Sequence, residues 1–261
     1  METWRLLIDP SHPGASNMAL DEALALSAAD SGRNTLRLYS FDPPAITVGR
    51  FQRIDGFLDT DVCDRQGVGL TRRPTGGLAI LHKDDFTYSV VSPRGATGSA
   101  GRDVHFRKIA DGVTAALGLL GISAEVASHG EAALGRGWCF EMEHGVDIVW
   151  ASRKICGSAQ RMAGGYVLQH GSLFLSENEA LLQELAPALG GRLSRSSFVT
   201  LDEACGRPVG WREVAEAFVS GFAGGLGVAL EPGELTPEER HRADVLEKTK
   251  YADRGWVRGG S

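Results

Sequence analysis

The sequence predicts an α+β fold with mixed, largely antiparallel sheets flanked by helices, and three observations support this prediction. Several short segments alternate apolar and polar residues with the period of a strand. Longer segments carry apolar residues three or four positions apart, as amphipathic helices do. The connections between neighbouring β segments near the end of this pattern are too short for crossover helices. This combination favours α+β over a doubly wound parallel sheet.

The first predicted elements are a strand, a helix and two short strands. Residues 4–8 are predicted to form the strand, and Ser16 or Asn17 is predicted to cap the helix that follows. Asp21 and Glu22 are predicted in the first turn of this helix, where the helix dipole favours acidic side chains. The apolar stripe of the helix consists of Leu20, Ala23, Leu24 and Ala28. Strands over 35–39 and 45–48 follow, with a turn at Pro43 and Pro44 between them.

The middle of the chain is predicted to contain strands around one long helix. Residues 78–82 and 86–91 are predicted as a pair of strands, and in the second strand Phe86, Tyr88 and Val90 occupy alternate positions. A helix over about 104–120 comes next. Because the turns that follow are short, three antiparallel strands are predicted to form a meander over 146–150, 154–160 and 166–175.

The C-terminal part is predicted to be helical. Apolar residues at helical spacing are Trp211, Val214, Ala215, Phe218 and Phe222. Before a last helix, Thr236, Pro237 and Glu239 combine an N-cap, an N1 proline and a capping-box glutamate. Since no internal repeat, low-complexity tract or long linker divides the chain, we predict a single domain over 1–261, with a core over about 1–206 and a helical segment over about 207–261.

Composition excludes several classes of protein. With 43% hydrophobic and 23% charged residues, the 261-residue chain is globular and neither disordered nor collagenous. A net charge of −6 argues against a nucleic-acid binder that relies on global charge. No run reaches the roughly 18 apolar residues of a membrane span, and the first residues lack the pattern of a secretory signal, so we expect no membrane association and a cytoplasmic protein. The four cysteines lack zinc spacing; we expect thiols and no metal.

A glycine-containing loop over 72–77 is the first candidate for chemistry. Gly76 and Gly77 allow backbone N–H groups to approach a ligand, and Arg72 and Arg73 supply charge for a phosphate or carboxylate. An ordinary hairpin turn with solvated arginines is the alternative. Residues 82–89 begin with His82 and place polar side chains on an otherwise apolar strand, which favours the binding loop.

The second and third candidates lie on the last two strands of the predicted meander. If the strand is regular, Lys154 and Cys156 share one face, and Ser158 and Gln160 continue that face. An inward lysine costs several kcal/mol unless it meets an anion or loses its proton, and the alternative is a strand-start lysine in solvent. Residues 169–172 place His170 within a strand, where a satisfied core histidine is the alternative to a functional one.

These motifs, in this order, resemble the catalytic domain shared by lipoate-protein ligases, octanoyltransferases and biotin-protein ligases. The matching segments are Trp4, 17–22, 49–52, 72–77, 87–89, 154–160, 169–172, Lys250, Tyr251 and Trp256. The resemblance covers nearly the whole chain and implies the biotin/lipoate protein ligase type of α+β catalytic domain. It also implies a bent apolar tunnel for a medium-length acyl chain, with the loop along it and Lys154 at the reacting carboxyl or thioester. The biotin branch fits worst, because its more basic glycine-arginine loop is not what stands at 72–77.

The resemblance implies roles for particular residues. The catalytic residues would be Cys139 and Lys154. The substrate-binding residues would be Arg72, Arg73, Thr75, Gly76, Gly77, His82, Ser158, His170 and Gly171. Cys139, in the segment Trp-Cys-Phe-Glu over 138–141, matches the loop cysteine of the cysteine-dependent octanoyltransferases that resemble ligases in sequence. The residues after 141 depart from that pattern; a buried thiol is the alternative interpretation of Cys139. Cys156 is the rival nucleophile, interpreted as a packing residue.

The resemblance implies an octanoyl-[acyl carrier protein]:protein N-octanoyltransferase of lipoyl cofactor assembly. Its partners would be octanoyl-acyl carrier protein and, as acceptors, lipoyl domains of 2-oxoacid dehydrogenases or a glycine-cleavage H protein. No cofactor is expected. The alternatives are an ATP-dependent lipoate-protein ligase, which would use ATP and Mg, a lipoyl amidotransferase, and a non-catalytic binder of lipoyl domains or acyl chains. The acidic carrier protein is expected to dock on a local basic rim formed by Arg72, Arg107, Lys108, Arg153 and Arg161.

Overall fold

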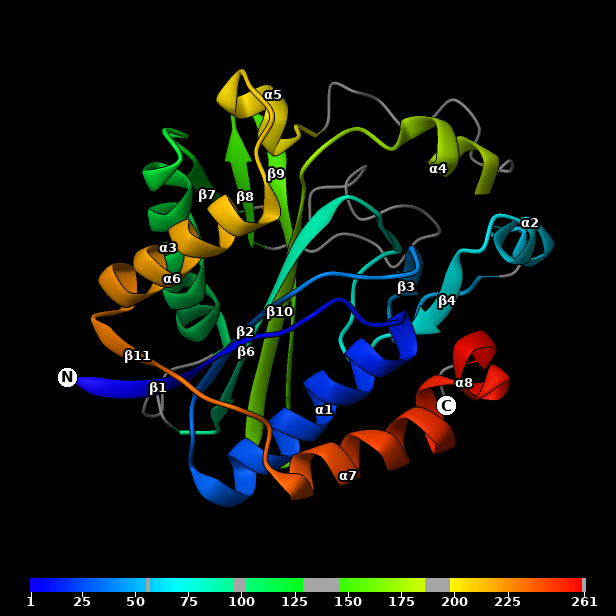
Figure 1. The fold of residues 1–261 in the computed structure, drawn as a ribbon, viewed down its shortest axis with the longest axis horizontal. Coiled ribbons are helices and arrows are strands. Elements are labelled where there is room, and N and C mark those ends of the chain that lie inside the picture. The colour runs from blue at the N-terminus through cyan, green and yellow to red at the C-terminus, as the bar shows by residue number, and fades with distance from the viewer. Residues whose placement is uncertain (55–56, 96–101, 129–145, 186–197, 260–261) are drawn as a thin grey trace.

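An eight-stranded mixed sheet forms the centre of the computed structural model, which describes residues 1–54, 57–95, 102–128, 146–185 and 198–259 (Figure 1). The strand order is β11 (Val228–Pro232), β1 (Glu2–Ile8), β2 (Thr35–Tyr39), β6 (Asp85–Pro93), β10 (Tyr166–Phe174), β9 (Arg153–Ala163), β8 (Val146–Trp150) and β7 (Glu125–Ser128). The first three strands run parallel, and every later neighbouring pair is antiparallel. The predicted α+β class and the β8–β9–β10 meander are both confirmed.

A second sheet of three described strands has the order β4 (Gly69–Arg72), β3 (Ala45–Val48) and β5 (Ile80–His82). The prediction that residues 78–82 pair with 86–91 is wrong, because β5 pairs with β3 whereas β6 belongs to the main sheet. The physical reason is that the two strands bury their apolar side chains in different cores: Ile80 lies in the cluster of the small sheet, and Phe86 in that of the main sheet.

Helices cover both faces of the main sheet (Figure 1). The helices are α1 (Gly14–Ser31), α2 (Thr60–Arg65), α3 (Arg102–Leu119), α4 (Glu179–Leu185), α5 (Leu201–Cys205), α6 (Trp211–Leu226), α7 (Pro237–Leu246), the π-helix η3 (Glu247–Tyr251) and α8 (Arg254–Gly259). The pair α3 and α6 packs on one face, and α1 with its neighbour α7 covers the other. None of the described helices is long and apolar enough to cross a lipid bilayer.

The alternation predicted for β6 places aromatic side chains on the face covered by α3 and α6. The rings of Phe86 and Phe218 lie 4.5 Å apart, and that of Tyr88 lies 5.8 Å from Phe218 and 5.7 Å from Phe222. Val91, on the opposite face of the same strand, packs in the cluster of α1. Strand periodicity therefore produces two separate apolar layers from one segment.

The start of α1 differs from the prediction. Pro13 occupies the N-cap position without a side-chain cap, and Asn17 lies inside the helix, where its amide donates to the carbonyl oxygens of His12 and Ser40. Asp21 and Glu22 consequently lie beyond the first turn. They are buried among cationic partners, so their side chains pair with charges from other elements and do not serve the helix dipole.

The C-terminal segment is not wholly helical, because β11 joins the main sheet parallel to β1. The capping box predicted at the start of α7 is confirmed by reciprocal bonds between Thr236 and Glu239. The same glutamate accepts two bonds of 2.7 and 2.8 Å from the buried guanidinium of Arg5. Residues after 226 are thus tied to the first strand of the chain.

We predict that two glycine substitutions in α6 have opposite effects on stability. A Cβ at Gly221 would lie 2.4 Å from the backbone of Ala116 in α3, so Gly221→Ala should lower the free energy of unfolding by about 1–3 kcal/mol. A Cβ at Gly224 would meet nothing within 4 Å. Gly224→Ala should therefore raise the free energy of unfolding by up to about 1 kcal/mol through helix propensity. Urea unfolding measures both, and equal effects would contradict a close crossing of α3 and α6.

Candidate active site

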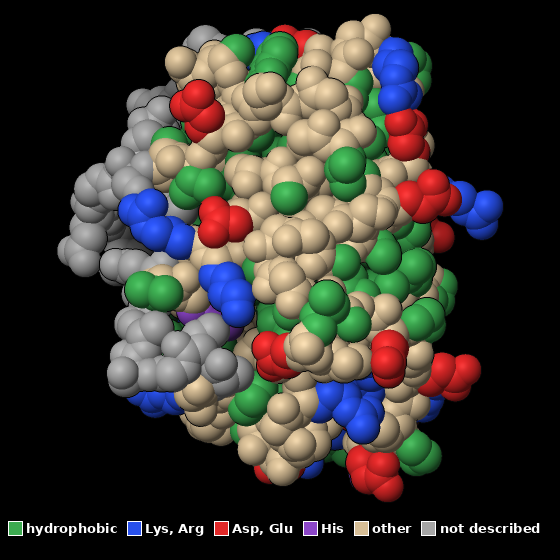
Figure 2. Space-filling model, turned by 90° about the vertical axis from the view of Figure 1, so that its left-hand side faces the viewer, with side chains coloured by type: hydrophobic (Ala, Val, Ile, Leu, Met, Phe, Trp, Pro, Cys, Tyr) green, Lys and Arg blue, Asp and Glu red, His purple; other side chains and the backbone are tan. Residues whose placement is uncertain are grey.

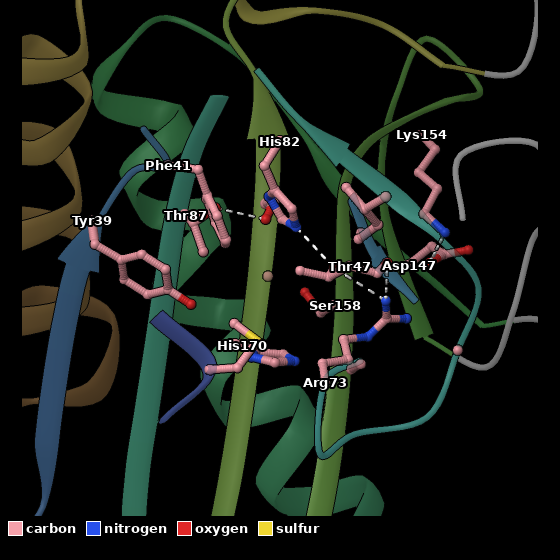
Figure 3. A pocket seen from close by; sticks show the side chains of 17 residues that line it. Tyr39, Phe41, Thr47, Arg73, His82, Thr87, Asp147, Lys154, Ser158 and His170 are labelled. Atoms are coloured by element: carbon pink, nitrogen blue, oxygen red, sulfur yellow. Dashed lines mark hydrogen bonds and ion pairs between the residues drawn. The ribbon is translucent and has the colours of Figure 1, made fainter. Parts of the chain in front are cut away.

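A cavity lies between β9 and β10 of the main sheet and the loop and strands of the small sheet (Figure 3). Its volume is about 500 Å³, including its open mouth. The lining residues are Met18, Tyr39, Phe41, Thr47, Arg73, Gly77, Ile80, His82, Thr87, Asp147, Lys154, Gly157, Ser158, Ala159, His170, Gly171 and Ser172. Most of the residues predicted from the sequence to bind substrate therefore meet around one space.

Lys154 lies at one side of the cavity in a buried ion pair with Asp147. Its Nζ is 2.8 Å from Oδ1 of the aspartate, and the two side chains are 3% and 2% exposed. A buried lysine needs a nearby anion, and Asp147 supplies it. The alternative of a strand-start lysine in solvent is therefore wrong. Asp147 was not predicted as a site residue from the sequence. A signal was present, because Asp147 is the one acid of an apolar strand and the next strand along the chain contains Lys154.

The expectation that Lys154 and Cys156 share a face is wrong because β9 contains a bulge. Val149 pairs with Lys154 whereas Ile148 pairs with Cys156, so Ile155 is an extra residue in β9. One extra residue reverses the side-chain alternation. Lys154 lines the cavity, whereas Cys156 is fully buried in the main core cluster, which agrees with its interpretation as a packing residue.

Arg73 holds the loop over 73–77 in shape. Its guanidinium donates to the carbonyl oxygens of Thr47 at 3.0 Å, Gly76 at 2.8 and 3.1 Å, and Leu78 at 2.7 Å. Gly77 has φ +89°, and a Cβ there would lie 2.8 Å from Arg73 Nη2. A Cβ at Gly76 would meet nothing within 4 Å, so its backbone borders open space. Because Arg73 is 2% exposed and lines the cavity, a turn with solvated arginines is excluded.

Arg72 is not among the residues that line the cavity, and its predicted role in binding substrate stays a prediction. The side chain is 1% exposed, and its donors are committed to backbone carbonyls. These carbonyls belong to Gly49, Arg50, Gln52, Trp256, Val257 and Arg258. The Trp256 indole donates in return to the carbonyl oxygen of Arg72 at 2.8 Å. Arg72 therefore fastens α8 to the loop, and its burial also removes it from the predicted basic rim.

His170 is bonded through both ring nitrogens. Nε2 lies 2.7 Å from Thr75 Oγ1 in the loop, and Nδ1 lies 3.0 Å from Asp21 Oδ2 in α1. Burial lowers the pKa of this imidazole, against the opposing effect of Asp21. A neutral ring that donates from Nδ1 and accepts from Thr75 satisfies both contacts. His170 is thus a satisfied histidine that also borders the cavity and positions the loop.

Asp21 is a site residue that the sequence reasoning placed only at a helix end. Its fully buried carboxylate also accepts bonds from Arg37 and Tyr39 at 2.9 Å and from Ser89 at 2.8 Å. Burial by itself would raise the pKa of Asp21, but the bond from His170 and the charge of Arg37 outweigh it, so the pKa lies below its ordinary value. An acid within the most apolar part of a helix was the available signal.

His82 also lines the cavity, and its ring is bonded through both nitrogens as that of His170 is. Nδ1 is 2.7 Å from Asp85 Oδ2, Nε2 is 2.9 Å from Thr47 Oγ1, and the ring stacks on Phe41 with centroids 3.8 Å apart. Thr87 donates to the same carboxylate oxygen at 2.9 Å. These contacts fix the ring plane of His82 against the cavity.

Gly171 and Ser158 complete the wall formed by β9 and β10. A Cβ at Gly171 would lie 2.6 Å from Ser158 Oγ and 2.7 Å from the ring of Tyr88, so this position accepts no larger residue without a shift. Ser158 lines the cavity, and its hydroxyl forms a 2.9 Å hydrogen bond with Tyr88 OH.

The cavity is chemically asymmetric. Tyr39 and Phe41 lie toward one side and the pair of Lys154 and Asp147 toward the other, with the histidines and Arg73 between them (Figure 3). Such an arrangement suits a ligand with an apolar chain and a polar head. Within the described ranges, no group of three or more His, Cys, Asp or Glu side chains could hold a metal ion. Cys139 lies outside the described residues.

The predicted basic rim is not assembled as expected. Arg72 is buried, and Arg153 pairs with Glu203 at 2.7 Å. Arg107 is exposed on α3. On the face over α3 and α6, the described basic and acidic side chains are interspersed without a continuous patch of one sign (Figure 2).

We predict that Asp21→Asn lowers the free energy of unfolding at neutral pH by about 1–3 kcal/mol, because it removes one of the two carboxylates that pair with the buried Arg37 and weakens the bonds from Tyr39, Ser89 and His170. Since the folded pKa of Asp21 is depressed, its contribution is complete above the unfolded value of 3.8 and is lost as the pH falls through the folded pKa. The difference between variant and wild type should therefore shrink below that pH.

The matched control for this prediction is Asp30→Asn, on the same helix. Asp30 is 69% exposed, so its substitution should change the free energy of unfolding by no more than about 0.5 kcal/mol. Denaturant unfolding at a series of pH values measures both variants. A pH-independent loss in Asp21→Asn would show that the carboxylate charge is not what stabilises the fold.

The chain is similar to known proteins in sequence and in fold. Residues 13–223 match the lipoyl protein ligase A/B catalytic domain. Octanoyltransferase LipM of Symbiobacterium thermophilum is 39% identical over 276 residues, with 98% of each chain covered. Octanoyltransferase LipM of Kyrpidia tusciae is 39% identical over 268 residues, covering 97% of this chain and 98% of its own. The crystal structure of a lipoate-protein ligase A bound with ATP has a TM-score of 0.84 at 25% identity, with both chains fully covered.

The family match covers most of the chain, and the two LipM relatives align with this chain over nearly their whole length. The resemblance inferred from the sequence motifs is therefore confirmed, together with the fold that it implied. The chain belongs to the lipoyl protein ligase A/B catalytic domain family and is an enzyme of the acyltransferase class.

Proposed function

We propose that this enzyme transfers an octanoyl group from octanoyl-acyl carrier protein to a lysine of a lipoyl domain or glycine-cleavage H protein. The relatives named octanoyltransferase LipM support the reaction. The single observation that carries the proposal is the buried pair of Lys154 and Asp147 at the polar side of an otherwise largely apolar cavity. A thioester head and an apolar chain match these two sides. The proposed location is the cytoplasm, as the sequence predicts.

The proposed reaction has two steps. The Cys139 thiolate attacks the thioester carbonyl, the bond to the carrier sulfur breaks, and the departing thiolate takes up a proton. The amine of the acceptor lysine then attacks the new thioester, loses a proton as the amide forms, and releases the Cys139 thiolate. One site can in this way serve two protein partners in turn.

Lys154 is proposed to supply positive charge at the reacting carbonyl. Its ammonium group is held in place by Asp147, so the charge is oriented before substrate arrives. The same charge favours the thiolate form of a neighbouring cysteine. Backbone N–H groups of the loop over 75–77, whose Gly77 lines the cavity, are proposed as further donors to the oxyanion. Because the donor is already a thioester, no cofactor is proposed.

A lipoate-protein ligase is the second candidate, and one observation favours it. The similar ligase A structure contains ATP, and the chain covers that structure completely. A ligase would form an acyl-adenylate with ATP and Mg, and Cys139 would not react. The two candidates therefore differ in whether acylation needs ATP.

We predict that the wild type gains one octanoyl group at Cys139 when mixed with octanoyl-acyl carrier protein without ATP, as measured by intact mass. Cys139→Ala should take up no acyl group and modify no lipoyl domain. The matched control is Cys156→Ala, which removes a buried packing thiol and should retain both activities. Lys154→Met should slow acylation strongly, because the charge at the carbonyl is lost. Full acceptor modification by Cys139→Ala from the thioester donor would sink the covalent mechanism.

We also predict that activity depends on acyl chain length. If the chain is buried beside Tyr39 and Phe41, kcat/KM should rise from butanoyl to octanoyl donors by up to about fourfold per methylene, the equivalent of about 0.8 kcal/mol. Initial rates with a series of acyl donors measure this. A flat profile across these lengths would contradict a buried chain.

A further inference from the structure

A second concave surface lies on the outer side of the loop over 73–77. This groove, called the outer groove below, has a volume of about 950 Å³ including its open mouth. Its lining residues are Arg50, Arg161, Thr249, Lys250, Asp253, Gly255 and Trp256. They come from the turn after β3, from β9, from η3, from α8 and from residue 253 between these two helices, so segments far apart in the sequence build one surface.

Positive charge exceeds negative charge in the outer groove. Lys250 pairs with Glu22 at 2.6 Å, and the same carboxylate lies 3.9 Å from Arg161. Asp253 is engaged as an N-cap, because it accepts from the Trp256 N–H at 2.8 Å. Within the described part of the chain, no carboxylate lies at ion-pair distance from Arg50. Glu22 is therefore the carboxylate that Lys250 and Arg161 share, and it also accepts a bond from the Tyr251 hydroxyl.

The cations are close enough to repel one another. Burial lowers the pKa of Lys250, and the charges of Arg161 and Arg50 lower it further, against the opposing effect of Glu22. The indole ring of Trp256 lies among them. Its centroid is 4.5 Å from Lys250 Nζ and 5.7 Å from the Arg50 guanidinium carbon. An anion placed between these cations would relieve their repulsion.

The outer groove shares a wall with the cavity. The Arg50 N–H donates to the Thr75 carbonyl oxygen at 2.8 Å, and Arg161 donates to the Pro74 carbonyl oxygen at 3.4 Å. On the inner side, the Thr75 hydroxyl contacts His170 in the cavity wall. The cavity and the outer groove therefore border the same loop from its two sides.

We propose that the outer groove binds the phosphodiester of the pantetheine arm that carries the octanoyl thioester, an inference that rests on the proposed transferase function. Arginine presents planar pairs of donors that match phosphate oxygens, and Lys250 adds a point charge. A carboxylate partner would use the same charges, but the arm of a thioester donor brings its phosphate to the enzyme in every turnover. The groove then holds the donor while the thioester lies beside Lys154.

The test compares two donors that differ only in phosphate, octanoyl-pantetheine and octanoyl-4′-phosphopantetheine, with the full-length enzyme. The KM for octanoyl-pantetheine divided by the KM for octanoyl-4′-phosphopantetheine measures the contribution of the phosphate. Arg50→Gln and Arg161→Gln should each reduce this ratio by about fivefold, because each removes a charged donor but keeps an amide. The control Arg212→Gln, an exposed arginine on α6, should leave the ratio unchanged. An unchanged ratio in both groove variants would overturn the proposal.

Direct binding separates this proposal from the transferase function. If no thioester donor supports transfer, the proposed function fails, and calorimetry with 4′-phosphopantetheine and with ATP then tests the groove alone. Binding of 4′-phosphopantetheine that Arg161→Gln weakens about fivefold or more would support the groove. Binding of ATP alone with that dependence would assign the groove to a nucleotide and overturn the proposal, as would binding of neither compound.

Discussion

The buried carboxylate of Asp21 is the interaction on which the site depends. It is fully enclosed and accepts bonds from Arg37, Tyr39, Ser89 and His170, which belong to β2, β6 and β10. A charge in such a place is stable only when every lone pair is used, so the helix and three strands must meet in one arrangement. Through His170 the same carboxylate reaches the loop that borders the cavity. Fold stability and site geometry therefore share one network.

The loop over 73–77 is held from two sides by neighbouring arginines. Arg73 lines the cavity and bonds the carbonyls of the loop. Arg72 is buried on the other side of the loop and bonds the carbonyls of α8. The C-terminal segment thus forms the outer support of the cavity, together with the Trp256 bond to Arg72. A loop that is fixed before a ligand arrives loses little conformational entropy on binding. This explains why a segment remote in sequence carries residues typical of the family.

Much of the local structure could be predicted because its cause is local. The alternation in β6, the short turns of the β8–β10 meander and the capping box at Thr236 each depend on residues a few positions apart. The extra residue at Ile155 could not be predicted, since a bulge depends on the partner strand. It decides that Lys154 faces the cavity and Cys156 the core. The edge strand β11 also required its partner, β1.

The sequence by itself determined the fold class, the family and the polar motifs that border the cavity, because these follow from periodicity and from residues adjacent in the chain. Only the tertiary structure decided which of two adjacent arginines lines the cavity, that Asp147 faces Lys154, and that Asp21 pairs with Arg37 and His170. Each of these outcomes depends on which charge lies opposite in space. Burial makes an unpaired charge costly, so the partner, and not the residue type, sets the role of each polar side chain.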